Sequence, residues 1–248
     1  MIELFSRWRK KEEFVPNPKL KYTNKPLIGK KCGLFDDDEI IGFEDVKNLF
    51  YMAINADKPV HLLLVGPPAS GKSLFMSCLT SRLDRSYYAV GSSSTKSGIF
   101  DYLFEYRPRY LIIDEIEKMN KTDQTSLLNL MESGIISELK HRQQRSTQLK
   151  TWVFASCNST DKLLQPLLTR FQDIHFKPYT EEEFVAIAVK LLDKEEGIDS
   201  DIAAIIAKEV FNRFKTANIR ECVRIARLTK NDISKVQLII DTFKKYAA

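Results

Sequence analysis

The segment that most constrains this fold is an apolar run over residues 60–65 that leads directly into a glycine-rich loop. The loop places Gly66, Gly71, Lys72 and Ser73 in the spacing G-x-x-x-x-G-K-S. Glycines let backbone N–H groups turn inward around a phosphate, and a helix that begins at this point adds its partial positive charge. The pattern therefore predicts a strand, a phosphate-binding loop and a helix in that order.

Two residues of the loop have specific expected contacts with a nucleotide and its metal ion. Lys72 is expected to reach the β- and γ-phosphates, and the Ser73 hydroxyl to occupy one position around Mg²⁺. The competing interpretation is an ordinary Gly/Pro turn between a strand and a helix. The loop residues expected to surround the nucleotide are Gly66, Pro67, Pro68, Ala69, Ser70, Gly71, Lys72, Ser73 and Leu74.

An acidic pair, Asp114 and Glu115, ends a second apolar run over residues 110–113. Ligands bind at the carboxyl edge of a parallel sheet, so a pair at this place would lie beside the phosphates. We expect Asp114 to hold Mg²⁺, directly or through water, and Glu115 to orient and deprotonate an attacking water. A solvated strand end is the alternative.

The fold class follows from the alternation of strand and helix patterns between about residue 40 and residue 178. Apolar runs without polar alternation fit strands that are buried on both faces. Segments with helical spacing lie between them, at 72–83, 97–106 and 122–133. We therefore expect an α/β fold with a parallel sheet sandwiched by helices. The expected strands are 60–65, 87–90, 110–113, 151–157 and 173–176.

Three segments are expected along the chain. Residues 1–35 form a basic N-terminal extension, residues 36–178 the α/β nucleotide-binding core, and residues 179–248 an all-helical lid. The lid begins with Thr180 and Glu183, which are spaced as a capping box, and its apolar residues fit about four helices.

The charge of the chain is concentrated near its start. Residues 1–31 hold nine Lys/Arg and three Glu, a net charge of +6, whereas the remaining 29 basic and 30 acidic residues give −1. Such an arm favours nucleic acid or an acidic protein partner, and a solvated tail is the alternative.

Several classes of protein are excluded by the sequence. It contains no apolar run of about 18 residues and no apolar signal segment, so neither a membrane span nor a secretory signal is expected. The four cysteines are at least 46 positions apart, which argues against a metal site and favours reduced thiols. We therefore expect a cytoplasmic protein.

Together, the loop, the acidic pair and the helical C-terminal segment resemble the AAA+ ATPase module over residues 40–247. The resemblance implies ATP and Mg²⁺ as cofactors, ATP hydrolysis, and a homo-oligomeric ring, most often a hexamer. Ile41 and Gly42, followed by Val46, resemble the family segment that packs on adenine.

The same resemblance implies three further catalytic residues. Asn158 follows the 151–157 run, where the family places its sensor-1 residue beside the attacking water. Arg170 matches the arginine finger that reaches the nucleotide of a neighbouring subunit, and Arg220 matches the sensor-2 arginine. Each has a simpler alternative: a turn cap for Asn158, a surface ion pair for Arg170, and a register shift for Arg220, whose neighbours include other arginines.

The sequence between residues 134 and 149 predicts a β-hairpin with a basic tip. It resembles the hairpin before sensor 1 in Holliday-junction branch-migration motors, minichromosome-maintenance helicases and MoxR-type ATPases. Lys140, Arg142 and Arg145 would then contact DNA phosphates by charge alone. A solvated hairpin without a ligand is the alternative.

The function that this resemblance favours is a DNA-directed motor of the branch-migration or helicase type. The alternatives are a MoxR-like ATPase that remodels protein partners, and a nucleotide-gated assembly switch of the clamp-loader or initiator type. Residues 91–97 lack the aromatic residue of a polypeptide-threading loop, which weakens the first alternative. Residues 1–35 are a further candidate contact for a protein partner.

Overall fold

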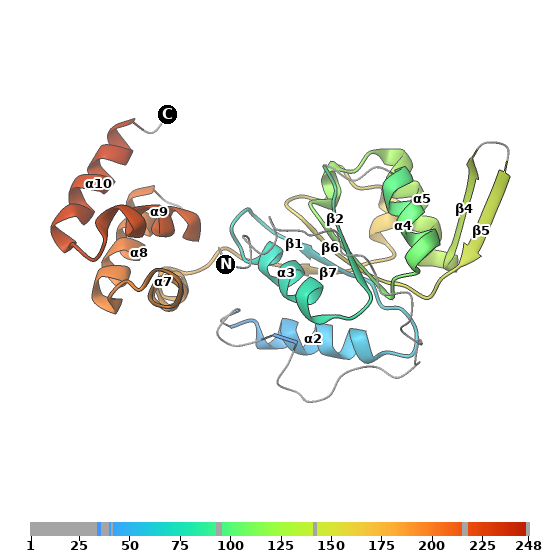
Figure 1. The fold of residues 1–248 in the computed structure, drawn as a ribbon, viewed down its shortest axis with the longest axis horizontal. Helices are drawn as coiled ribbons and strands as arrows, with labels where there is room; N and C mark the ends of the chain where they lie inside the picture. Colours follow the sequence, from blue (N-terminus) through green and yellow to red (C-terminus); the bar gives the residue numbers. More distant parts are fainter. Residues whose placement is uncertain are drawn as a thin grey trace. The chain divides into compact units, whose positions relative to one another are not determined.

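The computed structural model describes residues 34–35, 40, 42–92, 96–140, 143–214 and 218–246. The chain divides into two compact units, with the division between Phe176 and Lys177 (Figure 1). The first unit carries the phosphate loop and the second is helical, so each is described by itself.

The first unit is built on a five-stranded sheet with the strand order β2-β3-β6-β1-β7, and all of its strand pairs are parallel. All five expected strands are present, which confirms the α/β prediction. The crossovers between parallel strands are helical, as this topology requires. The strands are β1 (Leu62–Val65), β2 (Ser86–Val90), β3 (Tyr110–Asp114), β6 (Trp152–Cys157) and β7 (Gln172–His175).

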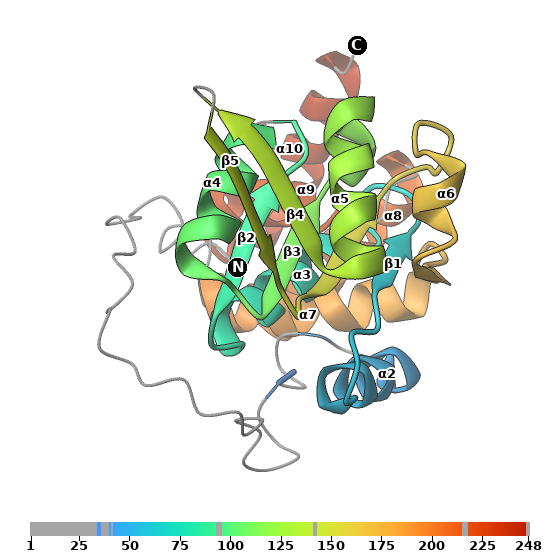
Figure 2. The same ribbon diagram turned by 90° about the vertical axis from the view of Figure 1, so that its right-hand side faces the viewer.

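Helices cover both faces of this sheet, as Figures 1 and 2 show. Successive side chains of a strand point to opposite faces. Leu62 and Leu64 therefore pack on one face against α2 and α3, whereas Leu63 and Val65 pack on the other against α4 and α5. The helices are α2 (Glu44–Asn55), α3 (Lys72–Arg82), α4 (Lys96–Tyr106) and α5 (Lys121–Ser133), with the short η1 (Ile116–Lys118) and α6 (Gln165–Leu168).

The predicted β-hairpin is confirmed as an antiparallel pair, β4 (Ile135–Lys140) and β5 (Gln143–Gln148), which forms a sheet of its own. It follows α5 directly, because Gly134 ends that helix in the left-handed conformation with φ 71°. Figure 2 shows the hairpin beside α4 and α5.

The second unit is a bundle of four helices around its own apolar core, in agreement with the sequence. The expected capping box is present: Glu183 N donates to Thr180 Oγ1 at 3.3 Å, and Thr180 N donates to Glu183 Oε2 at 2.9 Å. Phe184, Ala188 and Leu192 place the first helix against the other three. The helices are α7 (Glu181–Glu196), α8 (Ser200–Phe214), α9 (Ile219–Thr229) and α10 (Ile233–Tyr246).

Within the described part of the chain, no helix combines the length and the apolar character needed to cross a membrane. The cysteines described there, Cys78, Cys157 and Cys222, are buried and free of disulfides. Burial raises the pKa of the Cys157 and Cys222 thiols to about 12, so both stay protonated near neutral pH.

A buried histidine holds the start of the sheet together. His61 directly precedes β1 and is 8% exposed, and its Nδ1 accepts a hydrogen bond from Val153 N at 3.0 Å. The ring must be neutral at Nδ1 to accept this bond. Burial lowers the pKa of His61 to about 4, whereas a histidine in an unfolded chain titrates near pH 6.5.

We predict that the stabilisation due to His61 is complete above about pH 6.5 and is lost as the pH falls toward 4, because the unfolded chain then binds the proton more readily. Between about pH 7.5 and pH 5 the free energy of unfolding of the first unit should fall by about 2 kcal/mol for this reason. Urea unfolding followed by tryptophan fluorescence measures the loss.

Over the same pH range, the free energy of unfolding of the His61→Gln protein should fall by about 2 kcal/mol less than that of the wild type. Equal pH dependence of the wild-type and His61→Gln proteins would contradict the assignment.

Candidate functional site

The glycine-rich loop leaves the carboxyl end of β1 and enters α3. A Cβ atom on Gly66 would lie 2.7 Å from the Phe176 carbonyl oxygen, so no larger residue fits there without a shift. Gly71 has φ 89° and Ala69 has φ 64°, both in the left-handed region. Backbone in this conformation turns successive N–H groups to one side, which is the geometry of an anion nest.

The Lys72 side chain lies at the centre of this loop and is 5% exposed. Its Nζ donates to the carbonyl oxygens of Gly66 at 2.8 Å and Pro67 at 2.7 Å. It also donates to Ser70 Oγ at 3.2 Å and to Asn158 Oδ1 at 3.3 Å. Burial lowers the pKa of Lys72, and the negative charge of Asp114 opposes this change.

Asp114 ends β3 and is 8% exposed, with donors already placed around its carboxylate. Oδ1 accepts hydrogen bonds from Ser156 Oγ and from Glu115 N, and Oδ2 accepts one from Tyr88 Oη at 3.3 Å. Burial, reinforced by Asp114, raises the pKa of Tyr88, so this phenol remains a donor. A carboxylate has about four lone-pair positions, so Oδ2 keeps one for a further ligand.

Glu115 directly follows β3 and has φ 55°, a left-handed conformation at a non-glycine residue. Its carboxylate pairs with Lys118 Nζ at 2.8 Å, and both side chains are partly exposed. This pairing raises the pKa of Lys118. A backbone held in this uncommon region is a mark of functional sites.

Asn158 follows β6 directly, at the same sheet edge as the glycine-rich loop. Its Oδ1 accepts from Lys72, as described, while its backbone N and its Nδ2 both donate to Glu117 Oε1, at 3.1 Å and 3.0 Å. Glu117 thus fixes both the backbone and the amide orientation of Asn158.

Glu117 was missed by the sequence analysis, which found only the two acids before it. Its second oxygen, Oε2, is buried and has no hydrogen-bond partner among the described residues. From the sequence alone, Glu117 is indistinguishable from an ordinary charged residue in the turn after Glu115. The only available signal was a third acid within four residues of a strand end.

These residues fit the phosphates of a nucleotide and a Mg²⁺ ion. The loop presents turned N–H groups, Lys72 supplies a buried cation, and Asp114 keeps an open acceptor position. The Ser73 hydroxyl lies exposed in the first turn of α3, where it can become a metal ligand. Of the loop residues, Pro67, Pro68 and Ala69 are exposed and Ser70 is buried.

The comparisons with known proteins agree with this geometry. Residues 62–179 match the family described as "ATPase family associated with various cellular activities (AAA)". This stretch contains both the glycine-rich loop and the acidic pair. This matched stretch belongs to the AAA ATPase family.

Among the relatives of this AAA protein, a Holliday junction branch migration complex subunit RuvB from Fervidobacterium nodosum is 29% identical, over 68% of this chain and 53% of its own length. DNA replication licensing factor MCM6 from Oryza sativa subsp. indica is 23% identical over 76% of this chain and 26% of its own. The matched part of the chain therefore spans about half of the length of the RuvB relative and about a quarter of the length of the MCM6 relative.

Solved structures show the same fold. The Thermotoga maritima RuvB Holliday junction branch migration motor superposes with a TM-score of 0.58 and 24% identity, over 79% of this chain and 64% of that one. A point variant of the same protein gives a TM-score of 0.62 at 23% identity, over 81% and 66% of the two chains. At this identity the likeness concerns the fold alone.

Arg170 follows α6 on the surface of the AAA unit. Its Nη2 donates to Glu132 Oε1 at 2.6 Å and its Nη1 to Thr169 Oγ1 at 3.2 Å. The surface ion pair that was the alternative interpretation is therefore present within this chain. A role toward a neighbouring subunit stays a prediction.

Arg220 lies exposed in the first turn of α9, in the second unit. Asn218 caps this helix, since its Oδ1 accepts from Arg220 N at 3.1 Å. The expected adenine-packing segment is described in part, since Ile41 lies outside the described residues. Gly42 has φ 75°. The ring of the adjacent Phe43 stacks on the Phe176 ring, with 4.8 Å between the ring centroids.

The three cations expected at the hairpin differ in what the structure describes. The backbone of Lys140 lies in β4, and Arg142 lies outside the described residues. Arg145 forms an ion pair with Asp101 of α4, and its guanidinium lies 4.3 Å from the centroid of the Phe104 ring. Arg145 thus ties the hairpin to α4.

We predict that Glu117→Ala lowers the kcat of ATP hydrolysis about tenfold with little change in KM, because Asn158 loses its orientation while the phosphate loop is intact. Glu117→Gln keeps an oxygen acceptor and should recover most of the rate. A coupled assay of steady-state hydrolysis measures both constants.

Asn158→Ala provides the matched test. If Glu117 acts through Asn158, the double variant should be no slower than Asn158→Ala alone. Additive losses in the double variant would show that Glu117 acts on its own.

Proposed function

We propose that this AAA protein hydrolyses ATP with Mg²⁺ in an oligomeric ring and uses the reaction to move or remodel DNA. The observation that carries the proposal is the convergence of Lys72, Asp114 and Asn158 at one sheet edge, with Glu115 directly beyond them. The resemblance to ring-forming ATPases supports a hexamer.

Each residue has a proposed task in hydrolysis. Lys72 binds the β- and γ-phosphates, Ser73 and Asp114 hold the metal, and Glu115 takes the proton of the attacking water. A Mg²⁺ ion held there would supply positive charge to offset the charge that develops on the phosphates during the transfer. The Glu115–Lys118 ion pair must open before the carboxylate can face a water.

Asn158 and two arginines are proposed to respond to the nucleotide. Asn158 exchanges its contact with Lys72 for one with the attacking water, while Glu117 keeps it in place. Arg220 contacts the phosphates bound by its own chain. Arg170 leaves Glu132 to reach the γ-phosphate held by a neighbouring copy, where an arginine stabilises the charge of the transition state.

The DNA-directed part of the proposal is supported by the relatives, whose names refer to branch migration and DNA replication licensing. The hairpin between α5 and β6 supports it as well. One observation favours the alternative, an ATPase that remodels a protein partner: Arg145 is occupied by Asp101, which leaves the hairpin one cation fewer for phosphates.

Steady-state ATP hydrolysis, measured against protein concentration with and without single-stranded, duplex and four-way-junction DNA, tests the proposal. We expect the rate per chain to rise with protein concentration and to rise further with DNA. Glu115→Gln should abolish hydrolysis, since it removes the base. A rate that depends on concentration and not on DNA would point to a protein client, and full activity of Glu115→Gln would contradict the mechanism.

Arg170 can be tested in the same assay because its intramolecular partner offers a control. Arg170→Ala should lose about 10³-fold in rate if it acts on a neighbouring nucleotide, whereas Glu132→Gln should keep the wild-type rate. A mixture of the Arg170→Ala and Glu115→Gln proteins should regain activity, since each supplies what the other lacks. If Arg170→Ala and Glu132→Gln lower the rate of hydrolysis equally, Arg170 serves only in its ion pair with Glu132 and not in catalysis.

A further inference from the structure

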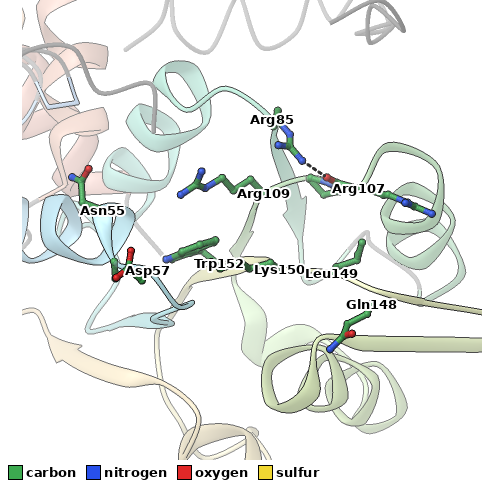
Figure 3. Close-up of a pocket in the computed structure, with 11 residues that line it drawn as sticks. Asn55, Asp57, Arg85, Arg107, Arg109, Gln148, Leu149, Lys150 and Trp152 are labelled. Atoms are coloured by element: carbon green, nitrogen blue, oxygen red, sulfur yellow. Dashed lines mark hydrogen bonds between the residues drawn. The ribbon is translucent and has the colours of Figure 1, made fainter. Parts of the chain in front are cut away.

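A second pocket lies at the edge of the sheet opposite the glycine-rich loop. Its lining residues lie at or just before the starts of strands β2, β3 and β6, at the end of β5 and at the end of α2, whereas the nucleotide site follows the carboxyl ends of the sheet strands. The hollow has a volume of about 530 Å³. Figure 3 shows its side chains. A site at this edge has no part in the hydrolysis described above.

The pocket is strongly basic. Arg85, Arg107, Arg109 and Lys150 line it, and Asp57 is the one acidic side chain among its lining residues. The hollow lined by these four cations is called the basic pocket below. The cations come from the segments before three different strands. They give the lining a net charge of +3, from four positive charges and one negative. Cations gathered from separate segments favour an anionic ligand.

Three of these cations have no acidic partner. Within the part of the chain that the structure describes, Arg107, Arg109 and Lys150 form no ion pair, and Arg109 Nε is buried without an acceptor. Arginines elsewhere in the described chain are commonly paired with an acid. The paired arginines are Arg145, Arg170, Arg213, Arg224 and Arg227.

The cations are held in place by contacts other than ion pairs. Arg109 lies over Trp152, with 4.7 Å from its guanidinium carbon to the ring centroid, as Figure 3 shows. Arg85 Nη2 donates to the Arg107 carbonyl oxygen at 3.1 Å. Arg85 and Arg107 both have left-handed backbones, with φ 61° and 47°. Strain of this kind at two neighbouring cations is typical of a pre-organised binding site.

Two tyrosines of an aromatic stack lie within two residues of arginines of the basic pocket. Tyr102 lies between Tyr87 and Tyr106, with ring centroids 3.9 Å and 4.5 Å apart. Tyr106 directly precedes Arg107, and Tyr87 follows Arg85 by two residues. Proteins that bind single-stranded nucleic acid combine a cationic groove for the backbone with aromatic rings on which bases stack.

We propose that the basic pocket binds consecutive phosphates of a single-stranded nucleic acid, with a base stacked against Tyr106. This inference rests on the proposed DNA-directed function and gives it a contact site at the base of the hairpin, away from the hairpin tip. Four cations around an open hollow accommodate more than one phosphate group. A free polyphosphate would use the cations alone and leave the tyrosine stack without a role.

The test is binding of a fluorescently labelled oligothymidine of about 20 nucleotides, measured by anisotropy at several salt concentrations. The double variant Arg107→Glu/Lys150→Glu changes two exposed residues of the pocket. Its control is Lys190→Glu/Lys208→Glu, which makes the same change in net charge at exposed positions of the second unit.

The pocket variant should bind on the order of tenfold or more weakly at about 0.1 M salt, and its slope of log K against log [salt] should be shallower by about 1.4, since two phosphate contacts are lost. The control should stay within about twofold of wild type, because its lysines lie outside the contact. Tyr106→Ala should weaken binding about tenfold with an unchanged salt slope, because stacking is not electrostatic. Basal ATP hydrolysis without DNA should be the same in all four proteins.

Each other outcome overturns the inference in a recognisable way. If wild type binds the oligonucleotide and the pocket variant binds equally well, this site is wrong while the DNA-directed function stands. If wild type binds no DNA at all, the proposed function fails with it. If inorganic tripolyphosphate competes as strongly as unlabelled oligothymidine and Tyr106→Ala binds normally, the pocket is a site for free polyphosphate.

Discussion

The buried ammonium group of Lys72 is the feature on which the nucleotide site depends. A cation at 5% exposure is costly unless acceptors surround it, and its acceptors come from two strand ends: the carbonyls after β1 and Asn158 after β6. Asp114, the last residue of β3, adds a negative charge that favours the charged form of Lys72. These groups meet only if the three adjacent strands end at one level. The parallel register thus brings these groups together. In the proposed function, incoming phosphates would replace the contacts that Lys72 now makes.

Much of this arrangement could be predicted from local sequence. The five strands, the hairpin and the capping box are determined by apolar runs and short-range hydrogen bonding, and all of them are confirmed. The convergence of Lys72 and Asn158 agrees with the topology, because the glycine-rich loop that leads to Lys72 follows β1 and Asn158 follows β6, and both are buried parallel strands. Patterns of this kind depend on a few neighbouring residues, so they can be recognised without knowledge of the packing.

The interactions that sequence did not predict join residues far apart in the chain. Glu117 binds Asn158 across 41 positions, and Arg145 meets Asp101 across 44. The basic pocket draws Arg85, Arg109 and Lys150 from three separate segments, none of which is a motif by itself. Such contacts depend on side-chain geometry after the sheet has formed. They also change the functional interpretation, because Arg145 pairs with Asp101 while the basic pocket offers four other cations to an anionic ligand.

Lys72 is proposed to be the cation that binds the phosphates of ATP. The most direct measurement is calorimetric titration of ATP with Mg²⁺ into the Glu115→Gln protein, which retains the loop and does not turn the nucleotide over. We expect saturable binding at one site per chain, weakened at least about tenfold when Lys72→Met is added, since charge-assisted contacts are lost. Unchanged affinity after Lys72→Met, or no binding by the Glu115→Gln protein, would contradict it.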